Sequence, residues 1–119
     1  MNSIIKKPWG NYKVLNRSKN HLIKKIFVKS GGKLSLQSHK HRSEYWIVLE
    51  GAAKVTLNDS VKSLKISESI YIPRLAKHRL ENIGDKKLLI MEVQFGDILS
   101  EKDIVRYDDI YNRKTLNDN

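Results

Sequence analysis

The chain has 119 residues, a length that predicts one domain over 1–119 and excludes a second core within it. Lys and Arg number 23 against 13 Asp and Glu, a formal net charge of +10 at pH 7, which favours an anionic partner over a cationic one. No cysteine is present, which excludes disulfides and thiol nucleophiles and leaves His, carboxylate and amide oxygen as possible metal ligands.

The positive charge has two possible partners, a polyanion or a phosphorylated small molecule. The basic residues are spread along the chain, and no zinc-finger, helix-turn-helix or aromatic RNA-binding motif accompanies them. We therefore predict a solvated basic surface and no nucleic-acid partner. No apolar run of about 18 residues occurs either, so we expect no membrane contact and a soluble, cytoplasmic protein.

Short runs of alternating apolar and polar residues predict about eight strands. In chain order they cover 22–29, 34–41, 44–49, 53–57, 61–66, 70–72, 78–82 and 87–95. Turn residues such as Gly31-Gly32, Asn58-Asp59 and Gly84-Asp85 separate them. Many short antiparallel strands in a small chain predict an all-β sandwich or jelly roll, because stacking or closing the sheets removes exposed edges.

The C-terminal region has a different pattern. The sequence Ser100-Glu101-Lys102-Asp103 resembles a helix capping box, which predicts a short helix through about Asp109. The polar tail that starts at residue 112 has few apolar side chains to pack. We expect the domain core over about 7–113 and a loose end over 114–119.

The strand predicted over 34–41 carries an unusual polar face. Side chains of a strand alternate between its two faces, so Leu34 and Leu36 share one face, and the other carries Ser35, Gln37, His39 and His41. A polar row inside a barrel costs several kcal/mol unless its members are paired or bind a ligand. This strand is therefore expected to have a partner.

Two further side chains join this set. Glu44 shares a face with Trp46 and Val48 and should be buried, where a carboxylate needs a cation. His78 follows the rigid Ile72-Pro73 step at the start of another predicted strand. Together with the polar row, these residues predict a site that binds a cation.

These residues carry a resemblance to a known family. The spacing Gly31-x5-Gln37-x-His39-x4-Glu44-x6-Gly51 is similar to the first motif of the cupins, with Gln37 in place of the first His. Pro73-x-Leu75-x2-His78-x3-Asn82 resembles the second motif, with Ser67 where that motif begins with Gly. An alternative alignment pairs His39 with His41, but it leaves two residues before Glu44, so we prefer Gln37 and His39. The resemblance implies a cupin jelly-roll barrel.

Longer strings narrow the resemblance to the phosphomannose isomerase domain of type II enzymes. They span about 7–113 and include Pro8-Trp9-Gly10-x-Tyr12, His41-Arg42-x-Glu44-x-Trp46, His78-Arg79-Leu80-Glu81-Asn82 and Asp103-Ile104-Val105-Arg106-Tyr107. In that family the domain often follows a larger mannose-1-phosphate guanylyltransferase part. The family commonly has His at positions 40 and 45 and Gly at 75 and 112, where this chain has Lys40, Tyr45, Leu75 and Asn112.

The resemblance implies one divalent metal bound by Gln37, His39, Glu44 and His78. Such mixed nitrogen and oxygen donors suit Zn, Mn, Fe, Co or Ni. The alternative is a buried polar network without metal, as in some cupins. Isomerase chemistry also needs a general base, for which Glu92 is the first candidate, because a carboxylate near a cation can be tuned for proton transfer, and His41 the second. The residues proposed to bind substrate are Lys40, Arg42, Gln94, Arg106 and Arg113.

From the residues alone several of these roles stay open. Glu92 and Gln94 share a face of the strand 87–95, and periodicity allows that face to be inside the barrel or exposed at an edge. The arginines suit phosphate through their planar forks, although a single basic residue is more often a solvated surface charge.

The predicted function is a metal-dependent aldose–ketose isomerase of carbohydrate metabolism that converts mannose 6-phosphate to fructose 6-phosphate for polysaccharide biosynthesis. Two alternatives are a non-catalytic module that binds sugar phosphates and a small iron-dependent cupin oxygenase. We also predict a homodimer, because Leu34 and Leu36 point away from the polar face and would leave an apolar surface to cover.

Overall fold

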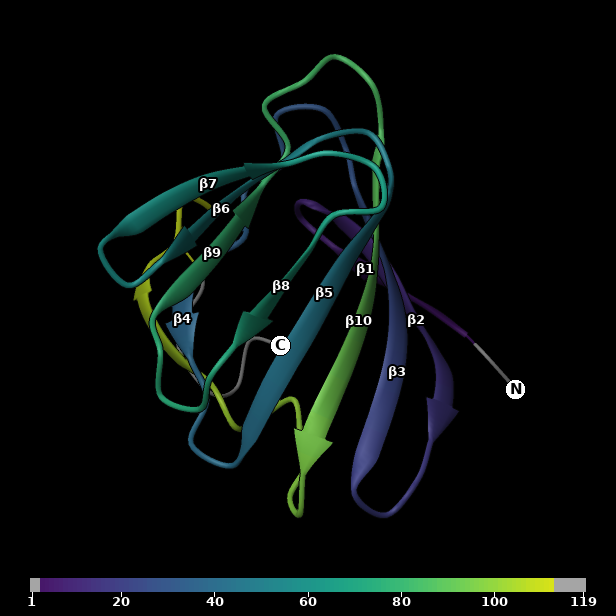
Figure 1. The fold of residues 1–119 in the computed structure, drawn as a ribbon, viewed down its shortest axis with the longest axis vertical. Helices are drawn as coiled ribbons and strands as arrows, with labels where there is room; N and C mark the ends of the chain where they lie inside the picture. The colour runs from purple at the N-terminus through teal and green to yellow at the C-terminus, as the bar shows by residue number, and fades with distance from the viewer. Residues whose placement is uncertain (1–2, 113–119) are drawn as a thin grey trace.

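The computed structural model describes residues 3–112, which form eleven β-strands in two antiparallel sheets (Figure 1). The first sheet has six strands. Their order across the sheet is β1 (Ile4–Lys7), β2 (Gly10–Arg17), β3 (His21–Val28), β10 (Leu88–Gly96), β5 (Arg42–Glu50) and β8 (Ser69–Ile72). Residues 3–112 include no helix long and apolar enough to cross a membrane.

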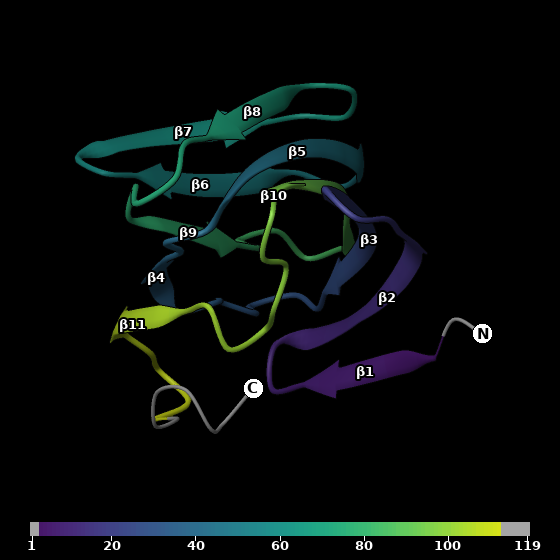
Figure 2. The same cartoon turned by 90° about the horizontal axis from the view of Figure 1, so that it is seen from below.

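The second sheet has five strands. Their order is β11 (Val105–Asp108), β4 (Leu36–Ser38), β9 (His78–Glu81), β6 (Ala53–Leu57) and β7 (Ser60–Leu64). Seen from below, the strands of the two sheets surround a common interior (Figure 2). The predicted all-β jelly roll is thus confirmed.

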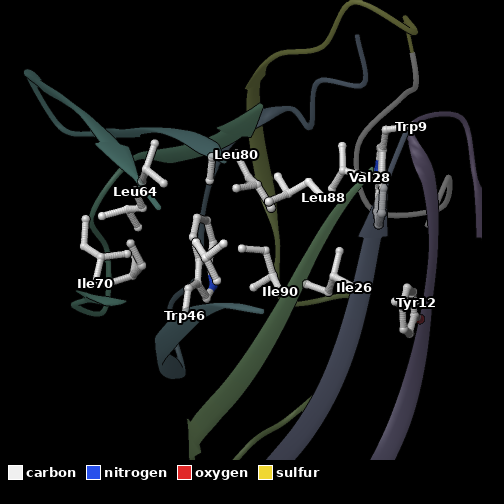
Figure 3. Close-up of a cluster of buried hydrophobic side chains, with 14 of the residues drawn as sticks. Trp9, Tyr12, Ile26, Val28, Trp46, Leu64, Ile70, Leu80, Leu88 and Ile90 are labelled. Atoms are coloured by element: carbon white, nitrogen blue, oxygen red, sulfur yellow. The ribbon is translucent and has the colours of Figure 1, made fainter. Parts of the chain in front are cut away.

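Alternation along the long strands fills this interior. In β3 every second side chain from Leu22 is buried, and in β10 the same holds from Leu88. Apolar side chains of both sheets meet in one cluster that includes Trp9, Trp46 and Leu80 (Figure 3). The apolar cluster occupies one part of the interior. Polar residues of the same strands occupy another part, because Glu92 and Gln94 continue the inward face of β10.

The predicted C-terminal helix is wrong. Residues 100–103 form a turn in which the Asp103 amide donates to the Ser100 carbonyl at 3.0 Å, and β11 follows. The Asp103 carboxylate does not cap a helix, because it accepts hydrogen bonds from the backbone amides of Lys40 and His41, both at 2.9 Å. The chain after this turn pairs with the free edge of β4, with Val105 opposite Ser38. Tertiary contacts here prevail over the local helix propensity of the sequence.

The strand predictions also need correction. The number is eleven and not eight, because β1, β2 and β11 were not predicted. In β2 a register shift between Val14 and Asn16 interrupts the alternation that would identify a strand. The strand predicted over 34–41 is reduced to β4, three residues long. Leu34 precedes β4, packs against the apolar cluster and lines the internal cavity, so its predicted outward orientation is wrong.

Three positions where the related motifs have glycine adopt a left-handed backbone conformation. The φ angles are +74° at Ser67, +70° at Leu75 and +57° at Asn112. A side chain costs free energy in this conformation, which glycine avoids. The backbone has therefore kept the turns of the motifs although the residues differ. At Leu75 the amide donates to the His39 carbonyl at 2.9 Å, so this turn supports the segment that carries a proposed metal ligand.

Candidate metal centre and cavity

Three buried side chains from different parts of the chain meet inside the barrel. His39 lies in the turn between β4 and β5, Glu44 in β5 and His78 at the start of β9. Glu44 belongs to the six-stranded sheet and His78 to the five-stranded one, so the fold closes the site from both sides. One nitrogen or oxygen of each residue lies within 4.8 Å of the others, a spacing that a single metal ion can bridge.

The two imidazoles are oriented by backbone carbonyls. His39 Nδ1 lies 2.6 Å from the Asp103 carbonyl oxygen, and His78 Nδ1 lies 3.0 Å from that of Ala76. A carbonyl oxygen only accepts hydrogen bonds, so each Nδ1 carries the proton and each Nε2 carries the lone pair. Both Nε2 atoms face Glu44, at 3.2 Å from Oε2 for His39 and 3.9 Å from Oε1 for His78. Metal-binding histidines have this arrangement.

Burial and charge give the three groups the protonation states that a metal requires. Burial lowers the pKa of His39 to about 4 and also lowers the pKa of His78, so both imidazoles are neutral near pH 7. Burial alone would raise the pKa of Glu44, but the neighbouring Arg42 guanidinium holds it well below its usual range. Two neutral imidazoles and one carboxylate fit a divalent cation.

Glu44 and His39 also contact the Arg42 guanidinium. Arg42 Nε donates to Glu44 Oε2 at 2.8 Å, and its Nη2 lies 3.3 Å from His39 Nε2. Trp46 Nε1 donates to the other oxygen of Glu44 at 3.0 Å. His39 Nε2 has one lone pair, so a metal ion at this atom would replace the contact with Arg42. The donor set thus already faces a positive charge, which supports its fit to a cation.

Gln37, the fourth residue of the predicted set, lies on β4 and lines the same cavity as Glu44 and His78. Its backbone pairs with His78 of β9, which places the two residues side by side. Its amide Nε2 donates to Ser35 Oγ at 2.9 Å, which fixes the amide group. An amide oxygen would add a neutral donor to the three residues above.

The cavity beside these donors has a volume of about 60 Å³. Among its lining residues are Gln37, Arg42, Glu44, His78, Glu92 and Arg106. Glu92 lies in β10, where its backbone is opposite Lys24 of β3 on one side and Trp46 of β5 on the other. The candidate base therefore lines the same cavity as Gln37, Glu44 and His78, three of the four candidate metal donors.

The carboxyl group of Glu92 has a raised pKa. Burial, reinforced by the negative charge of Glu44, raises the pKa of Glu92 to about 7, although Lys24 and Arg42 act in the opposite direction. Gln94 Nε2 donates to Glu92 Oε2 at 2.6 Å, which orients the carboxyl group. A group with a pKa near 7 can both accept and donate a proton at physiological pH.

The other predicted substrate residues are placed differently. Lys40 is exposed and His41 is half-buried, and neither belongs to the residues that line the cavity. Arg106 is half-buried in β11 and lines it. Arg113 lies outside the described residues, as does the tail 114–119. Of the two candidate bases, the structure brings only Glu92 to the cavity wall.

Sequence reasoning missed Lys24 and Glu101, which also line the cavity. Lys24 had a signal, because it alternates in phase with the buried residues Leu22 and Ile26 on β3. Glu101 had none, because it lies in the turn that replaced the predicted helix and reaches the cavity only through the tertiary fold. Asp103, whose carbonyl orients His39, was likewise assigned to that helix.

Comparison with known proteins agrees with this architecture. Residues 1–109 match the family described as mannose-6-phosphate isomerase C-terminal. The chain is 45% identical over 113 residues to mannose-1-phosphate guanylyltransferase ManC of Salmonella typhimurium, covering 95% of this chain and 24% of that protein. It is 47% identical over 109 residues to alginate biosynthesis protein AlgA of Pseudomonas fluorescens, covering 92% and 23%. The chain thus spans about a quarter of the length of these curated relatives.

Solved structures show the same fold at low sequence identity. An oxalate decarboxylase of Bacillus subtilis, in its S161A variant, superposes with a TM-score of 0.76 at 22% identity, covering 88% of this chain and 30% of that one. A double-stranded β-helix protein of Klebsiella pneumoniae gives 0.70 at 16% identity, covering 79% and 80%. With the family match over residues 1–109, these findings show that the chain belongs to the mannose-6-phosphate isomerase C-terminal family, with a cupin fold.

Proposed function

We propose that this chain catalyses the interconversion of mannose 6-phosphate and fructose 6-phosphate with the help of one divalent metal ion. Family membership supports the class of reaction. The observation that carries the proposal is the position of Glu92, a buried carboxyl group with a pKa of about 7 in the wall of the cavity that holds His78 and Glu44. An isomerase needs such a group beside such a donor set.

The metal would be held by His39, Glu44 and His78, with Gln37 as a fourth donor. When bound, a divalent ion supplies a Lewis acid that stabilises negative charge developing on the sugar oxygens. The chain contributes the dry surroundings of this charge, because His39, Glu44 and His78 are each no more than 3% exposed. Arg42 adds a fixed positive charge beside Glu44.

Glu92 acts as the general base and acid that transfers the proton. Conversion of an aldose to a ketose moves a proton from C2 to C1 through an enediolate, while a hydroxyl proton passes from O2 to O1. One group must therefore take the carbon-bound proton and return it to the neighbouring carbon. Glu92 removes the proton as a carboxylate and returns it as a carboxylic acid, and its pKa near 7 makes both forms available. Gln94 holds the carboxyl group in place during the transfer. A barrel interior protects the transferred proton from exchange with water.

A coupled assay for fructose 6-phosphate with mannose 6-phosphate as substrate tests the proposal. We expect turnover with a divalent metal present, loss of turnover after chelation and recovery when Zn, Mn, Fe, Co or Ni is added back. Glu92→Gln should lower kcat by about 100-fold to 10,000-fold, the usual contribution of a general base. Glu50→Gln is the matched control, since this residue at the end of β5 is exposed and does not line the cavity.

Four results would contradict the proposal. Turnover that survives thorough chelation would exclude a role for the metal. An unchanged kcat in Glu92→Gln would exclude Glu92 as the general base. Tight binding of mannose 6-phosphate without any turnover would favour the non-catalytic module. Oxygen consumption with iron and a sugar substrate would favour the oxygenase.

A further inference from the structure

One carboxylate inside the cavity lies among several cations. Glu101 Oε2 forms an ion pair with Lys24 Nζ at 2.5 Å. Burial alone would raise the pKa of Glu101, but Lys24, Arg42 and Lys7 together lower it. All four side chains line the cavity. Three basic side chains, Lys24, Lys7 and Arg42, thus line one cavity and define a candidate anion site, in which Glu101 is paired with Lys24.

The side chain of Lys24 is held in the cavity wall by its surroundings. Its side chain is only 6% exposed, and its ammonium group lies 4.0 Å from the centre of the Tyr12 ring. Its backbone is opposite Glu92 in the neighbouring strand. A lysine this deeply buried needs an anion close by at all times, because an unpaired buried charge is costly.

Glu101, in contrast, is partly open to solvent. Its side chain is 39% exposed, so the carboxylate can rotate towards water. The backbone on both sides of it is fixed, because the Ser100 carbonyl accepts from Arg42 Nη1 at 3.0 Å and the Asp103 carboxylate accepts from the amides of Lys40 and His41. Only the Glu101 side chain has to move for another anion to reach Lys24.

A phosphate group suits this site better than a carboxylate does. A phosphate monoester carries close to two negative charges near pH 7 and has three acceptor oxygens, whereas a carboxylate carries one charge and has two oxygens. Three basic side chains match the larger anion. The site also lies in the same cavity as Glu92, Glu44 and His78, so a bound phosphate group would be attached to a sugar within that cavity.

We propose that the phosphate group of the substrate binds at Lys24, Lys7 and Arg42 in place of the Glu101 carboxylate, which acts as an internal competitor in the free protein. This inference rests on the proposed function for the identity of the sugar. The anion site itself does not depend on the proposed function, because inorganic phosphate alone can probe that site.

Titration calorimetry with inorganic phosphate, on protein dialysed after chelation, tests the anion site without metal and without turnover. Glu101→Gln keeps the shape of the side chain and removes the competing charge, so the Kd for phosphate should fall about tenfold, the effect of one charged contact. Lys24→Gln should raise the Kd about tenfold or more, and Lys24→Arg should restore binding. Glu50→Gln, which removes a carboxylate from a half-exposed pair with Lys87, should change nothing.

The same variants with mannose and mannose 6-phosphate separate this inference from the proposed function. Tighter binding of mannose 6-phosphate but not of mannose in Glu101→Gln supports the anion site, even if no isomerase activity is found. An unchanged or weaker phosphate affinity in folded Glu101→Gln overturns the inference, even if the isomerase is active. Equal losses for both sugars in Lys24→Gln and Lys24→Arg, at unchanged melting temperature, would also overturn it.

Discussion

Replacement of Glu92 by Gln should stabilise the metal-free protein, and the size of the effect should depend on pH. Glu92 is 5% exposed, and burial with the nearby Glu44 charge raises its pKa from the usual 4.5 to about 7. The folded state therefore binds this proton more tightly than the unfolded state. Stability is highest while Glu92 is protonated and falls as the pH rises from the unfolded pKa to the folded one.

The magnitude follows from the two pKa values. Each pH unit between 4.5 and about 7 costs about 1.4 kcal/mol, which adds up to about 3 kcal/mol above the folded pKa. Gln has the shape of the protonated acid and does not titrate. The free energy of unfolding of Glu92→Gln should equal that of the natural chain near the unfolded pKa and exceed it by up to about 3 kcal/mol above neutral pH.

Urea unfolding of both chains at a series of pH values from about 5 to about 8.5, after chelation, measures this difference. The difference between the two curves cancels the titration of every group that they share. A difference that is constant across this range, or one that favours the natural chain at high pH, would refute the raised pKa. Either result would also contradict the role of Glu92 as the group that transfers the proton in isomerisation.

Four further predictions address the metal site, the turns and the assembly. His78→Ala should weaken metal binding by more than about 100-fold, because an imidazole donor is lost, whereas His41→Ala should leave it unchanged; metal titration distinguishes the two. Asp103→Ala should lower the free energy of unfolding by about 1–3 kcal/mol, because the amides of Lys40 and His41 lose their acceptor, and metal affinity should fall with it. Ser67→Gly should raise the free energy of unfolding by about 0.5–1 kcal/mol in urea, because the relief of the +74° φ angle outweighs the added freedom of the unfolded chain. The homodimer stays a prediction, and sedimentation of a monomer at micromolar concentration would contradict it.

The sequence by itself determined which side chains share a face of each long strand. Side chains alternate along any strand, so the apolar residues of 88–95 carry Glu92 and Gln94 with them to whichever face is buried. The same rule placed Glu44 beside Trp46 in the interior. Motif spacing then selected His39 and His78, which the fold brings within reach of Glu44. These features follow from local geometry and need no knowledge of the neighbouring strands.

Tertiary structure decided the features that depend on which segments become neighbours. The residues after Ser100 form a turn and a strand because Asp103 binds the turn before β5 and Val105 pairs with the edge of β4. That pairing brings Glu101 to Lys24, although 77 positions separate them in the chain. The pKa of Glu92 is likewise a property of its surroundings, since burial and the charge of Glu44 raise it. Long-range pairing and burial set charges and contacts that local sequence patterns do not encode.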